Sequence, residues 1–494
     1  MSELRHVVVI GGGLSGLSAA HRLIELRPGL NVSLLEAGPR LGGVLQSERR
    51  DGFLIERSAD TFITNVPWGI DLCRRLGLED QLLGTDPERR KAYVVAHGRL
   101  EPVPEGFVLM MPSKMWPMVT TPILSVAGKL RMMGEFFIPP RAGKEDESLQ
   151  SFTVRRFGQE VFERLVQPLI GGIYTADPTK LSMQATMPRF LEMEREYGSI
   201  IRGAQRKKST GDLSDGKSSG ARYGMFVAPR DGMESIIAAL AQKLPPGSIR
   251  LNTKVERLVR SGDRGWRIQT GELTSPLECD AVIVALPAPK GAAILQTVDG
   301  ELAGLLERIP YAGASILVSA YKRSQIRHSL DGFGFVVPLV EERTILSCSF
   351  ASLKYPGRAP EGTVLLRVFI GGACQSGLLQ LSKSALIELA EREVAELLRI
   401  QGEPILRHIK RHTRAMPQYH VGHSLRVAKI NRLLKVHPTL TMASNALSGV
   451  GVPACIESGK RAAKQLLAAD GQEDSESGGR AVAATRMSCL ARNS

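Results

Sequence analysis

The feature that most constrains the fold is a glycine-rich stretch near the start of the chain, residues 6–20 (HVVVIGGGLSGLSAA). Its first apolar residues, VVVI, form an uninterrupted run of the kind that a strand buried on both faces requires. The glycines that follow, Gly11, Gly13 and Gly16, have the spacing G-x-G-x-x-G, which allows a tight turn, a close approach by a phosphate and tight packing of helix on strand. We therefore expect a buried strand, a turn and a helix over residues 14–26, whose first amides point at an anion.

An acidic residue completes the pattern. A second apolar run, residues 32–35, ends at Glu36, twenty residues after Gly16. A carboxylate at this distance accepts hydrogen bonds from ribose hydroxyls in dinucleotide-binding domains. Glycine spacing alone is weak evidence because glycine-rich turns are common, but the order strand, turn, helix, strand and acid is specific. We interpret the segment as a dinucleotide site.

The residues after Glu36 indicate which dinucleotide is bound. The sequence continues AGPRLGG, a glycine-rich turn with one arginine. It is either a second approach of backbone to the cofactor or a polar β-turn in which glycine supplies positive φ. The stretch EAGPRLGG resembles the flavin-dependent amine oxidase superfamily. That resemblance implies FAD, with Arg40, Gly42 and Gly43 along its pyrophosphate and beside its isoalloxazine.

Composition restricts the class of protein. With 494 residues, 43% of them hydrophobic, the chain can form two to four packed domains. The net charge of +14 favours an anionic partner, which is a membrane surface, an acidic substrate or nucleic acid. Nucleic acid ranks last, because only 5% of residues are aromatic and no basic run is interleaved with aromatics. Six widely spaced cysteines without a CxxC pair argue against zinc and a disulfide framework, and the lack of a leader before the first strand favours a cytoplasmic protein.

The segment from residue 107 to 140 has a different composition, rich in Met, Pro and large apolar residues. Its charge-free run, residues 115–128, contains Pro117 and Pro122 and is shorter than the roughly 20 residues that span a bilayer. Two interpretations stay open. The segment packs its apolar faces inward as an ordinary helical subdomain, or it dips into one leaflet with Lys114, Lys129 and Arg131 against anionic headgroups.

Two features lie near the end of the chain. His408, His412, His420 and His423 fall in one short window, and the first two have the i, i+4 spacing of a helical metal pair. Pro417 interrupts any helix there and the window holds no Cys or carboxylate, so we favour local hydrogen bonding and expect no metal. Residues 440–467 predict a strand, a glycine-rich turn and a helix, whose N-terminus is aimed at an anionic or carbonyl-like group.

Six segments in order carry a closer resemblance: GFLIERSADTFI, MPSKMWP, SVAGKLRM, QPLIGGIYTADPTKLS, MPQYHVGH and SGVGVPACIESGKRAA. They are similar to the oxygen-dependent protoporphyrinogen oxidase family of haem biosynthesis, over residues 5–467. The resemblance implies non-covalent FAD, a porphyrinogen substrate, molecular oxygen as acceptor and peripheral attachment to the cytoplasmic membrane through the segment 107–140. A homodimer is compatible with the resemblance, which does not determine the oligomeric state.

The resemblance also implies site residues. Those expected at FAD are Gly11, Gly12, Gly13, Leu14, Ser15 and Gly16 at the pyrophosphate, Glu36 and Ala37 at the ribose, Val255 at the adenine, Val44, Ser58, Ala59, Asp60 and Thr61 near the isoalloxazine, and Gly449, Val450, Gly451 and Val452 beneath the flavin. Those expected at the substrate are Phe369 against a pyrrole ring, Val336 and Ser349 as walls, and Lys91 at a propionate, with Arg90 and Ala92 as alternatives. The chain departs from the family at Ser58-Ala59, where Gly-Pro is common, at Ala176, commonly Gly, at Ala454, commonly Asp, and at Ser349, which is more often apolar.

The expected fold class is α/β in a multi-domain α+β arrangement, with a Rossmann-type FAD-binding domain, a mixed-sheet substrate domain and a helical membrane-associating subdomain. A buried strand expected near residues 280–288 returns the chain to the nucleotide-binding sheet. The expected boundaries are 1–93, 225–290 and 437–470 for the FAD-binding domain, 94–202 for the helical subdomain with the substrate channel, 203–224 for a flexible loop, 291–436 for the substrate domain and 471–494 for a disordered tail.

The expected reaction is oxidation of protoporphyrinogen IX to protoporphyrin IX in three two-electron steps, with hydride passing to flavin N5 and oxygen reduced to hydrogen peroxide. No catalytic side chain is required if the cofactor oxidises the substrate and the protein only orients it. Coproporphyrinogen III is the alternative substrate, favoured by more basic side chains in the pocket. A different amine-oxidase-like oxidase, for which only Tyr419 hints at an aromatic cage, and a flavin-binding protein without activity are further alternatives.

Overall fold

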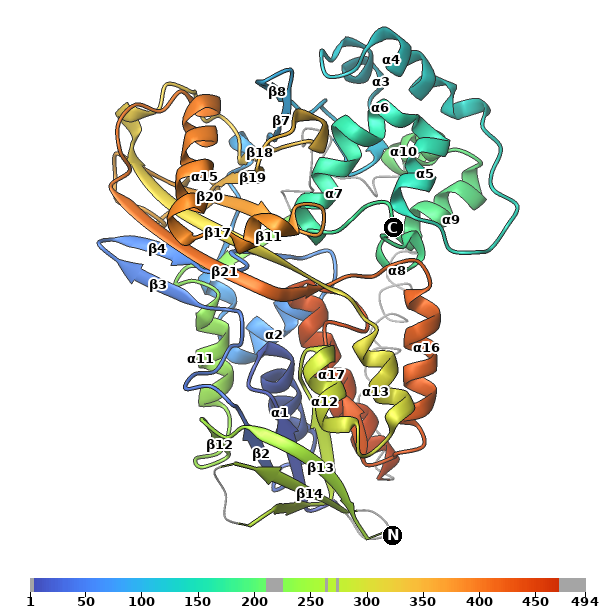
Figure 1. Cartoon of the computed structure of the whole chain (residues 1–494), viewed down its shortest axis with the longest axis vertical. Coiled ribbons are helices and arrows are strands. Elements are labelled where there is room, and N and C mark those ends of the chain that lie inside the picture. The colour runs from blue at the N-terminus through green and yellow to red at the C-terminus, as the bar shows by residue number, and fades with distance from the viewer. Residues whose placement is uncertain (1–3, 210–224, 263–264, 272–274, 471–494) are drawn as a thin grey trace, which may run out of the picture.

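The computed structural model of the chain describes residues 4–209, 225–262, 265–271 and 275–470 (Figure 1). In Figure 1 a parallel sheet with its helices occupies the lower half, a seven-stranded mixed sheet lies at upper left and a group of helices at upper right. The mixed α/β fold expected from the sequence is confirmed.

The parallel sheet is built from three separate parts of the chain. Its order is β12-β2-β1-β16-β22, and its strands are β12 (Ile249–Arg250), β2 (Asn31–Leu35), β1 (His6–Ile10), β16 (Ala281–Val284) and β22 (Leu440–Met442). Both faces of β1 are buried, because Val7 and Val9 pack in one hydrophobic cluster while Val8 and Ile10 pack in another. The uninterrupted apolar run therefore has the physical cause inferred from the sequence.

Helices cover both faces of this sheet. One cluster contains residues of α1 (Leu14–Leu26), α2 (Trp68–Leu76), α11 (Glu234–Gln242) and α17 (Val452–Ala469). The other contains residues of α12 (Ala288–Leu295), α13 (Gly300–Glu307), α16 (His423–Leu434) and the small antiparallel sheet of β13 (Val255–Ser261), β14 (Gly265–Thr270) and β15 (Leu277–Cys279). The expected substrate domain 291–436 therefore needs correction at both ends: α13 and α16 lie within it but bury their apolar residues against the parallel sheet.

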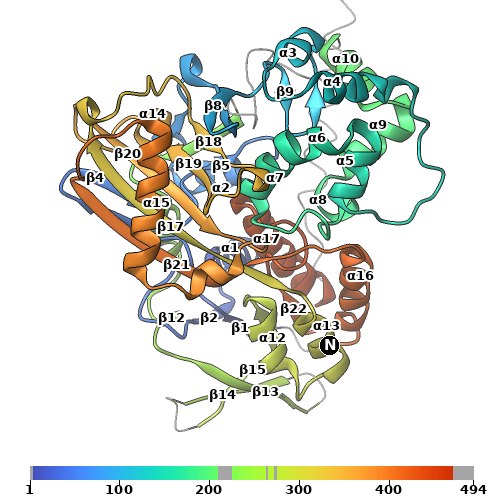
Figure 2. The ribbon, with the colours of Figure 1, turned by 45° about the horizontal axis from the view of Figure 1, so that its top comes forward.

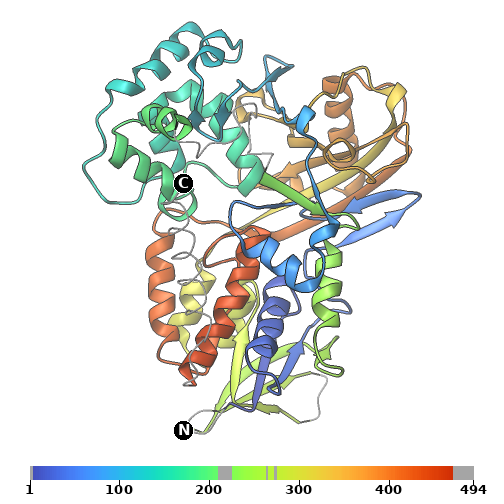
Figure 3. The same ribbon diagram turned by 180° about the vertical axis from the view of Figure 1, so that it is seen from behind.

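Helices α1 and α17 run side by side, as the view from behind shows (Figure 3). A Cβ atom on Gly459 would lie 2.2 Å from the Ser15 carbonyl oxygen and 2.9 Å from the Ala19 nitrogen. The two helices can approach this closely only because Gly459 has no side chain. Since both follow parallel strands, both begin at the same edge of the sheet.

The second sheet has the order β21-β17-β20-β19-β18-β7-β8. Its strands are β21 (Leu406–Pro417), β17 (Tyr311–Lys322), β20 (Thr363–Gly371), β19 (Ile345–Phe350), β18 (Gly334–Val336), β7 (Tyr93–Ala96) and β8 (Arg99–Pro102). The boundary expected at 93/94 is wrong, because β7 and β8 pair into this sheet instead of joining the helices. Helix α15 (Lys383–Leu398) covers the outer face (Figure 2). The hairpin of β3 (Ser47–Arg50) and β4 (Phe53–Glu56) packs on the other face.

The helical subdomain surrounds a separate core. Its elements are β9 (Phe107–Val108), β10 (Met111–Pro112), α3 (Met115–Thr120), α4 (Val126–Met133), η3 (Gly134–Phe137), α5 (Leu149–Phe157), α6 (Gln159–Val161), the π-helix η4 (Phe162–Val166), α7 (Gln167–Tyr174), α8 (Met183–Thr186), α9 (Pro188–Tyr197) and α10 (Ile200–Ser209). Since α10 ends at Ser209, residues 203–209 are helical, contrary to the expected loop at 203–224. The rest of that loop, residues 210–224, and the expected tail 471–494 lie outside the described residues.

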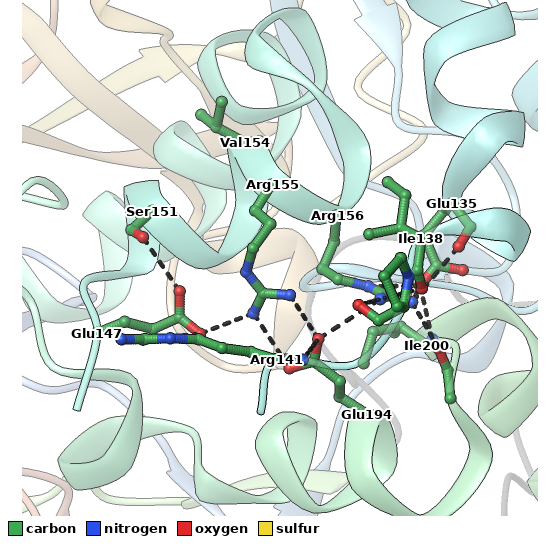
Figure 4. Close-up of polar contacts among 12 residues, drawn as sticks. Glu135, Ile138, Arg141, Glu147, Ser151, Val154, Arg155, Arg156, Glu194 and Ile200 are labelled. Carbon is green, nitrogen blue, oxygen red and sulfur yellow. Dashed lines mark hydrogen bonds and ion pairs between the residues drawn. The ribbon is translucent and has the colours of Figure 1, made fainter. Parts of the chain in front are cut away.

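A network of arginine and glutamate side chains ties this subdomain together (Figure 4). The Arg156 and Glu135 side chains are fully buried and form an ion pair. Arg155 lies between Glu147 and Glu194, at 2.7 and 2.5 Å, and Arg156 also lies 3.4 Å from Glu194. Because Glu135 belongs to η3, the network fixes the end of the apolar segment to α5 and α9.

The segment 107–140 buries one face and exposes the other. Met118, Ile123, Leu124 and Met132 are buried in the core of the subdomain. The exposed side chains are Trp116 (75%), Val126 (73%), Leu130 (61%) and Phe137 (87%). Two of the three expected cations are engaged within the protein, since Lys114 pairs with Glu105 and Arg131 donates to carbonyl oxygens at the end of α5. No helix within the described residues is long and apolar enough to cross a membrane.

Candidate flavin and substrate site

The turn after β1 has the geometry that its glycines predict. Gly11 has φ +112°, and a Cβ there would lie 2.4 Å from the Ala285 carbonyl oxygen. A Cβ on Gly16 would lie 1.9 Å from the Gly11 carbonyl oxygen. A side chain is therefore impossible at either position without moving backbone. Gly13 differs, because a Cβ there would meet nothing within 4 Å, so this part of the turn faces open space that can admit a phosphate.

Glu36 links the turn to the neighbouring strands. Its two carboxylate oxygens accept hydrogen bonds from the Gly12 and Gly38 amides, each at 2.8 Å. A carboxylate oxygen can accept a second bond, so Glu36 can still bind ribose hydroxyls. The Thr253 amide donates to the Glu36 carbonyl oxygen at 2.8 Å, which brings the start of β13 and Val255 to this end of the cradle.

The second glycine-rich loop lies against the first. The Gly42 amide donates to the Gly12 carbonyl oxygen at 2.8 Å, and Gly13 and Gly42 form a parallel bridge. Gly42 and Gly43 have φ values of +94° and +59°. The glycine-rich turn with positive φ and the second approach of backbone to the cofactor, which the sequence left as alternatives, are therefore compatible in one loop. The half-exposed Val44 follows at its edge.

Arg40 closes this loop. Its guanidinium donates to the carbonyl oxygens of Leu41 at 2.8 Å, Leu45 at 3.0 Å and Gly43 at 2.6 Å. These three bonds fix the path of residues 41–45. The structure thus gives Arg40 a role in shaping the loop, where the sequence predicted one along the pyrophosphate.

Two helix N-termini meet at the cradle. Helices α1 and α17 begin after Gly13 and Gly451, and neither has a side-chain cap on its first amides. Gly449 precedes α17 with φ +93°, and a Cβ there would lie 2.5 Å from the Ala454 Cβ. Free amides and the positive ends of two helix dipoles favour bound negative charge. With the open turn at Gly13, this arrangement fits the pyrophosphate of a dinucleotide.

Loop 57–61 connects the cradle to the seven-stranded sheet. Arg367 of β20 donates to the Ser58 carbonyl oxygen and lies 2.7 Å from the Asp60 carboxylate. Lys354 lies 3.5 Å from the same carboxylate. Burial alone would raise the pKa of Asp60, but Arg367 and Lys354 hold that pKa far below its usual range. Thr61 donates to the Val227 carbonyl oxygen at 2.8 Å.

Sequence reasoning missed Arg367 and Lys354. A signal for Arg367 was present, because a charged residue in the apolar strand sequence TVLLRVFIGG, two positions before Phe369, must share a sheet face with it. No comparable signal marks Lys354, which follows β19 in the short helix α14 (Ala351–Lys354).

Three of the expected substrate residues share one face of the seven-stranded sheet. Val336, Ser349 and Phe369 lie on β18, β19 and β20, on the face opposite α15. The register pairs Val336 with Ser347 and Ser347 with Phe369. Helix α7 approaches this face, since a Cβ on Gly172 would lie 3.8 Å from the Val336 Cγ1 atom.

The structure does not bring Lys91 to this face. Lys91 lies two residues before β7, on the side of Tyr93, whose cluster lies under α15. Its ammonium lies 3.4 Å from Asp331, to which the Tyr93 hydroxyl also donates. Ala92 is buried in the helical core, as is Val94, which is the register partner of Val336. Arg90 donates to the Thr85 carbonyl oxygen at 3.5 Å.

The local hydrogen bonding expected for the histidines is wrong for His412 and His423, whose side chains bond to residues outside the histidine window. His408 and His412 lie on a strand, and the His412 Nε2 atom is 2.8 Å from the Arg57 carbonyl oxygen. The His423 ring stacks on Tyr419 with centroids 4.1 Å apart, and its Nε2 atom lies 3.3 Å from the Leu447 carbonyl oxygen. Tyr419 is therefore part of a buried stack, and burial lowers the pKa of His423 to about 4. In the described ranges no three His, Cys, Asp or Glu side chains converge as metal ligands would.

A dinucleotide cradle joined to a mixed sheet is the architecture of an oxidoreductase with a bound dinucleotide, and the family match identifies it as flavin-dependent. The chain belongs to the Flavin containing amine oxidoreductase family, which matches residues 14–467. Its cofactor is FAD.

Relatives match along nearly the whole chain. Coproporphyrinogen III oxidase of Bacillus subtilis (strain 168) is 32% identical over 471 residues, 94% of this chain and 98% of that protein. Protoporphyrinogen oxidase 1, chloroplastic, of Arabidopsis thaliana is 28% identical over 473 residues, 91% of this chain and 86% of that protein. A crystal structure described as a protoporphyrinogen oxidase from Exiguobacterium sp. 255-15 superposes with a TM-score of 0.83 at 28% identity, covering 94% of this chain and 98% of that one.

Proposed function

We propose that this protein is a porphyrinogen oxidase, which converts a porphyrinogen to the porphyrin with FAD as oxidant and molecular oxygen as final acceptor. The observation that carries the proposal is that loop 57–61 joins the dinucleotide cradle to the sheet face that bears Val336, Ser349 and Phe369, with α7 beside Val336. A flat, largely apolar substrate suits such a face, and the names of the relatives supply the class of substrate.

In this proposal, the residues of the chain bind FAD and orient the porphyrinogen. The glycine-rich loops and the first amides of α1 and α17 would hold the pyrophosphate, and Glu36 would hold a ribose, with Val255 toward the adenine end. Phe369 and Val336 position the tetrapyrrole so that a saturated meso carbon faces the cofactor. When bound, FAD supplies a hydride acceptor at N5, which makes a catalytic acid or base on the protein unnecessary.

Two porphyrinogens are candidates, and two observations favour coproporphyrinogen III over protoporphyrinogen IX, which the resemblance placed first. Coproporphyrinogen carries four propionates instead of two, and the basic side chains of Lys354 and Arg367 lie on the proposed substrate face. The Bacillus subtilis relative, named for this substrate, is also the more similar of the two relatives described above. Protoporphyrinogen IX is the second candidate, favoured by the exposed apolar side chains of α3, α4 and η3, since a less charged substrate partitions into membranes.

The test is steady-state turnover of the purified FAD-loaded protein with each porphyrinogen, followed by porphyrin fluorescence and hydrogen peroxide. We expect turnover of both in air, with the higher kcat/KM for coproporphyrinogen III, and none without oxygen after the first cycle. A higher kcat/KM for protoporphyrinogen IX would reverse the order of the substrates. If neither substrate gave porphyrin, the proposal would be refuted.

We also propose that the protein attaches peripherally to the cytoplasmic face of a membrane through Trp116, Val126, Leu130 and Phe137. Burying such a side chain contributes about 1.5–3 kcal/mol, so four of them suffice for reversible attachment. Sedimentation with anionic lipid vesicles should retain the wild type, and Trp116→Ser with Phe137→Ser should release it. The matched control is Val436→Ser, an exposed apolar residue beyond the end of α16. Equal retention of all proteins by the vesicles, or retention of none, would contradict the attachment.

A homodimer stays a prediction, which sedimentation velocity can test.

A further inference from the structure

Three ionisable side chains meet where loop 57–61 touches the seven-stranded sheet. The Asp60 carboxylate lies 2.7 Å from the Arg367 guanidinium and 3.5 Å from the Lys354 ammonium. The Arg367 side chain is 2% exposed, that of Asp60 13% and that of Lys354 11%. We call these three residues the Asp60 triad.

The Asp60 triad holds one negative and two positive charges. The neighbouring ion pair of Arg358 and Glu56, at 3.2 Å, is also buried but balances itself. A surplus positive charge therefore stays in the buried site. Such a charge is costly unless an anion neutralises it.

Two polar atoms beside the Asp60 triad lack partners. The Nε atom of Arg367 and the hydroxyl of Ser58 are buried, and neither has a hydrogen-bond partner among the described residues. Buried polar atoms are paired in most proteins, so these two atoms can accept a water molecule or a bound ligand as partner.

The surplus charge lies among the residues of the proposed substrate face. Lys354 donates to the Ser349 hydroxyl at 3.2 Å. The Arg367 guanidinium carbon lies 5.3 Å from the centre of the Phe369 ring. Lys354 is more exposed than Arg367, so a ligand reaches its ammonium first.

We propose that the Asp60 triad is a carboxylate-binding subsite, in which Lys354 binds a propionate of the porphyrinogen while Asp60 and Ser349 hold its ammonium in place and Arg367 adds positive charge. The inference rests on the proposed function and identifies the residue that recognises the propionate groups of the substrate. Lys354 thereby takes the role that the sequence assigned to Lys91.

The test compares Lys354→Met, Lys354→Arg and the control Lys383→Met in the FAD-loaded protein. Lys383 is an exposed lysine at the start of α15, on the opposite side of the sheet. The substrates are coproporphyrinogen III and its uncharged tetramethyl ester. A hydrogen bond to a charged partner corresponds to roughly a tenfold to hundredfold change in binding.

We expect Lys354→Met to raise the KM for coproporphyrinogen III roughly tenfold to hundredfold, to leave the KM for the ester unchanged, and to retain FAD and thermal stability. Lys354→Arg should restore most of the affinity, and Lys383→Met should resemble the wild type. Equal losses for acid and ester, with a shifted reduction potential of the bound flavin, would overturn the proposal, because the charge would then serve the cofactor. An unchanged KM in Lys354→Met would also overturn it.

Binding of the product separates this inference from the proposed function. Coproporphyrin III should quench the flavin fluorescence of the wild type at lower concentration than that of Lys354→Met. If the wild type oxidised no porphyrinogen but bound coproporphyrin III in this Lys354-dependent manner, the subsite would stand and the proposed function would fail. Binding that is independent of Lys354 would overturn the subsite whether or not the protein is active.

Discussion

Replacing Arg156 by methionine should destabilise the helical subdomain by about 3 kcal/mol. Removing one partner of a buried ion pair costs about 3–5 kcal/mol, because the other charge stays buried without it. Here Arg156 and Glu135 are both fully buried, and Arg156 also donates to the carbonyl oxygens of Ile138 at 2.8 Å and Gly198 at 3.0 Å. Glu135 keeps hydrogen bonds from the Ser199 hydroxyl and the Ile200 amide, which places the cost at the lower end.

The assay is a double-mutant cycle with Glu135→Leu, read as hydrogen exchange of the α5 amides, since a chain of several domains does not unfold in one step. We expect the double variant Arg156→Met/Glu135→Leu to lose less than either single variant, because no uncompensated charge stays buried. If the loss in the double variant equalled the sum of the two single losses, or if Arg156→Met lost less than about 1 kcal/mol, the buried charge would not be the cause of the destabilisation.

Three further predictions concern the cradle and its support. Gly459→Val should separate α1 from α17 and lower the FAD content of the purified protein, measured as the ratio of flavin to protein absorbance; full FAD content would contradict it. Arg40→Leu removes three hydrogen bonds from loop 41–45 and should weaken FAD binding at least tenfold in a titration of the apoprotein, whereas an unchanged Kd would place the loop outside the cofactor site. Burial lowers the folded-state pKa of His423 to about 4 from 6.5, so acid favours the unfolded chain. This contribution to stability is present above pH 6.5 and falls by up to about 3 kcal/mol as the pH drops to 4; Tm measured across that range should fall less steeply in His423→Phe, and parallel curves would count against the assignment.

The sequence predicted those parts of the fold that depend on neighbouring residues. The strand β1, the turn at Gly11 and the helix α1 follow from local periodicity and from glycines that backbone contacts require. The strand β22 and the helix α17 likewise match the strand, glycine-rich turn and helix predicted over residues 440–467.

The rest depends on contacts between distant segments. Lys91 and Ala92 are adjacent in sequence, and only the pairing of β7 with β18 decides which of them lies on the side of the sheet that bears Val336. Lys354 meets Asp60 through a contact across almost three hundred positions, which no local pattern encodes. Strand pairing drew β7 and β8 out of the expected helical subdomain, and apolar packing placed α13 and α16 on the parallel sheet.

Porphyrinogen oxidation by this protein is tested most directly by an anaerobic titration of the FAD-loaded protein with coproporphyrinogen III or protoporphyrinogen IX, followed by flavin absorbance and porphyrin fluorescence. Complete oxidation of a porphyrinogen removes six electrons, so we expect that one equivalent bleaches three flavins and that admitting air restores them. If neither porphyrinogen bleached the flavin, the protein would not be a porphyrinogen oxidase.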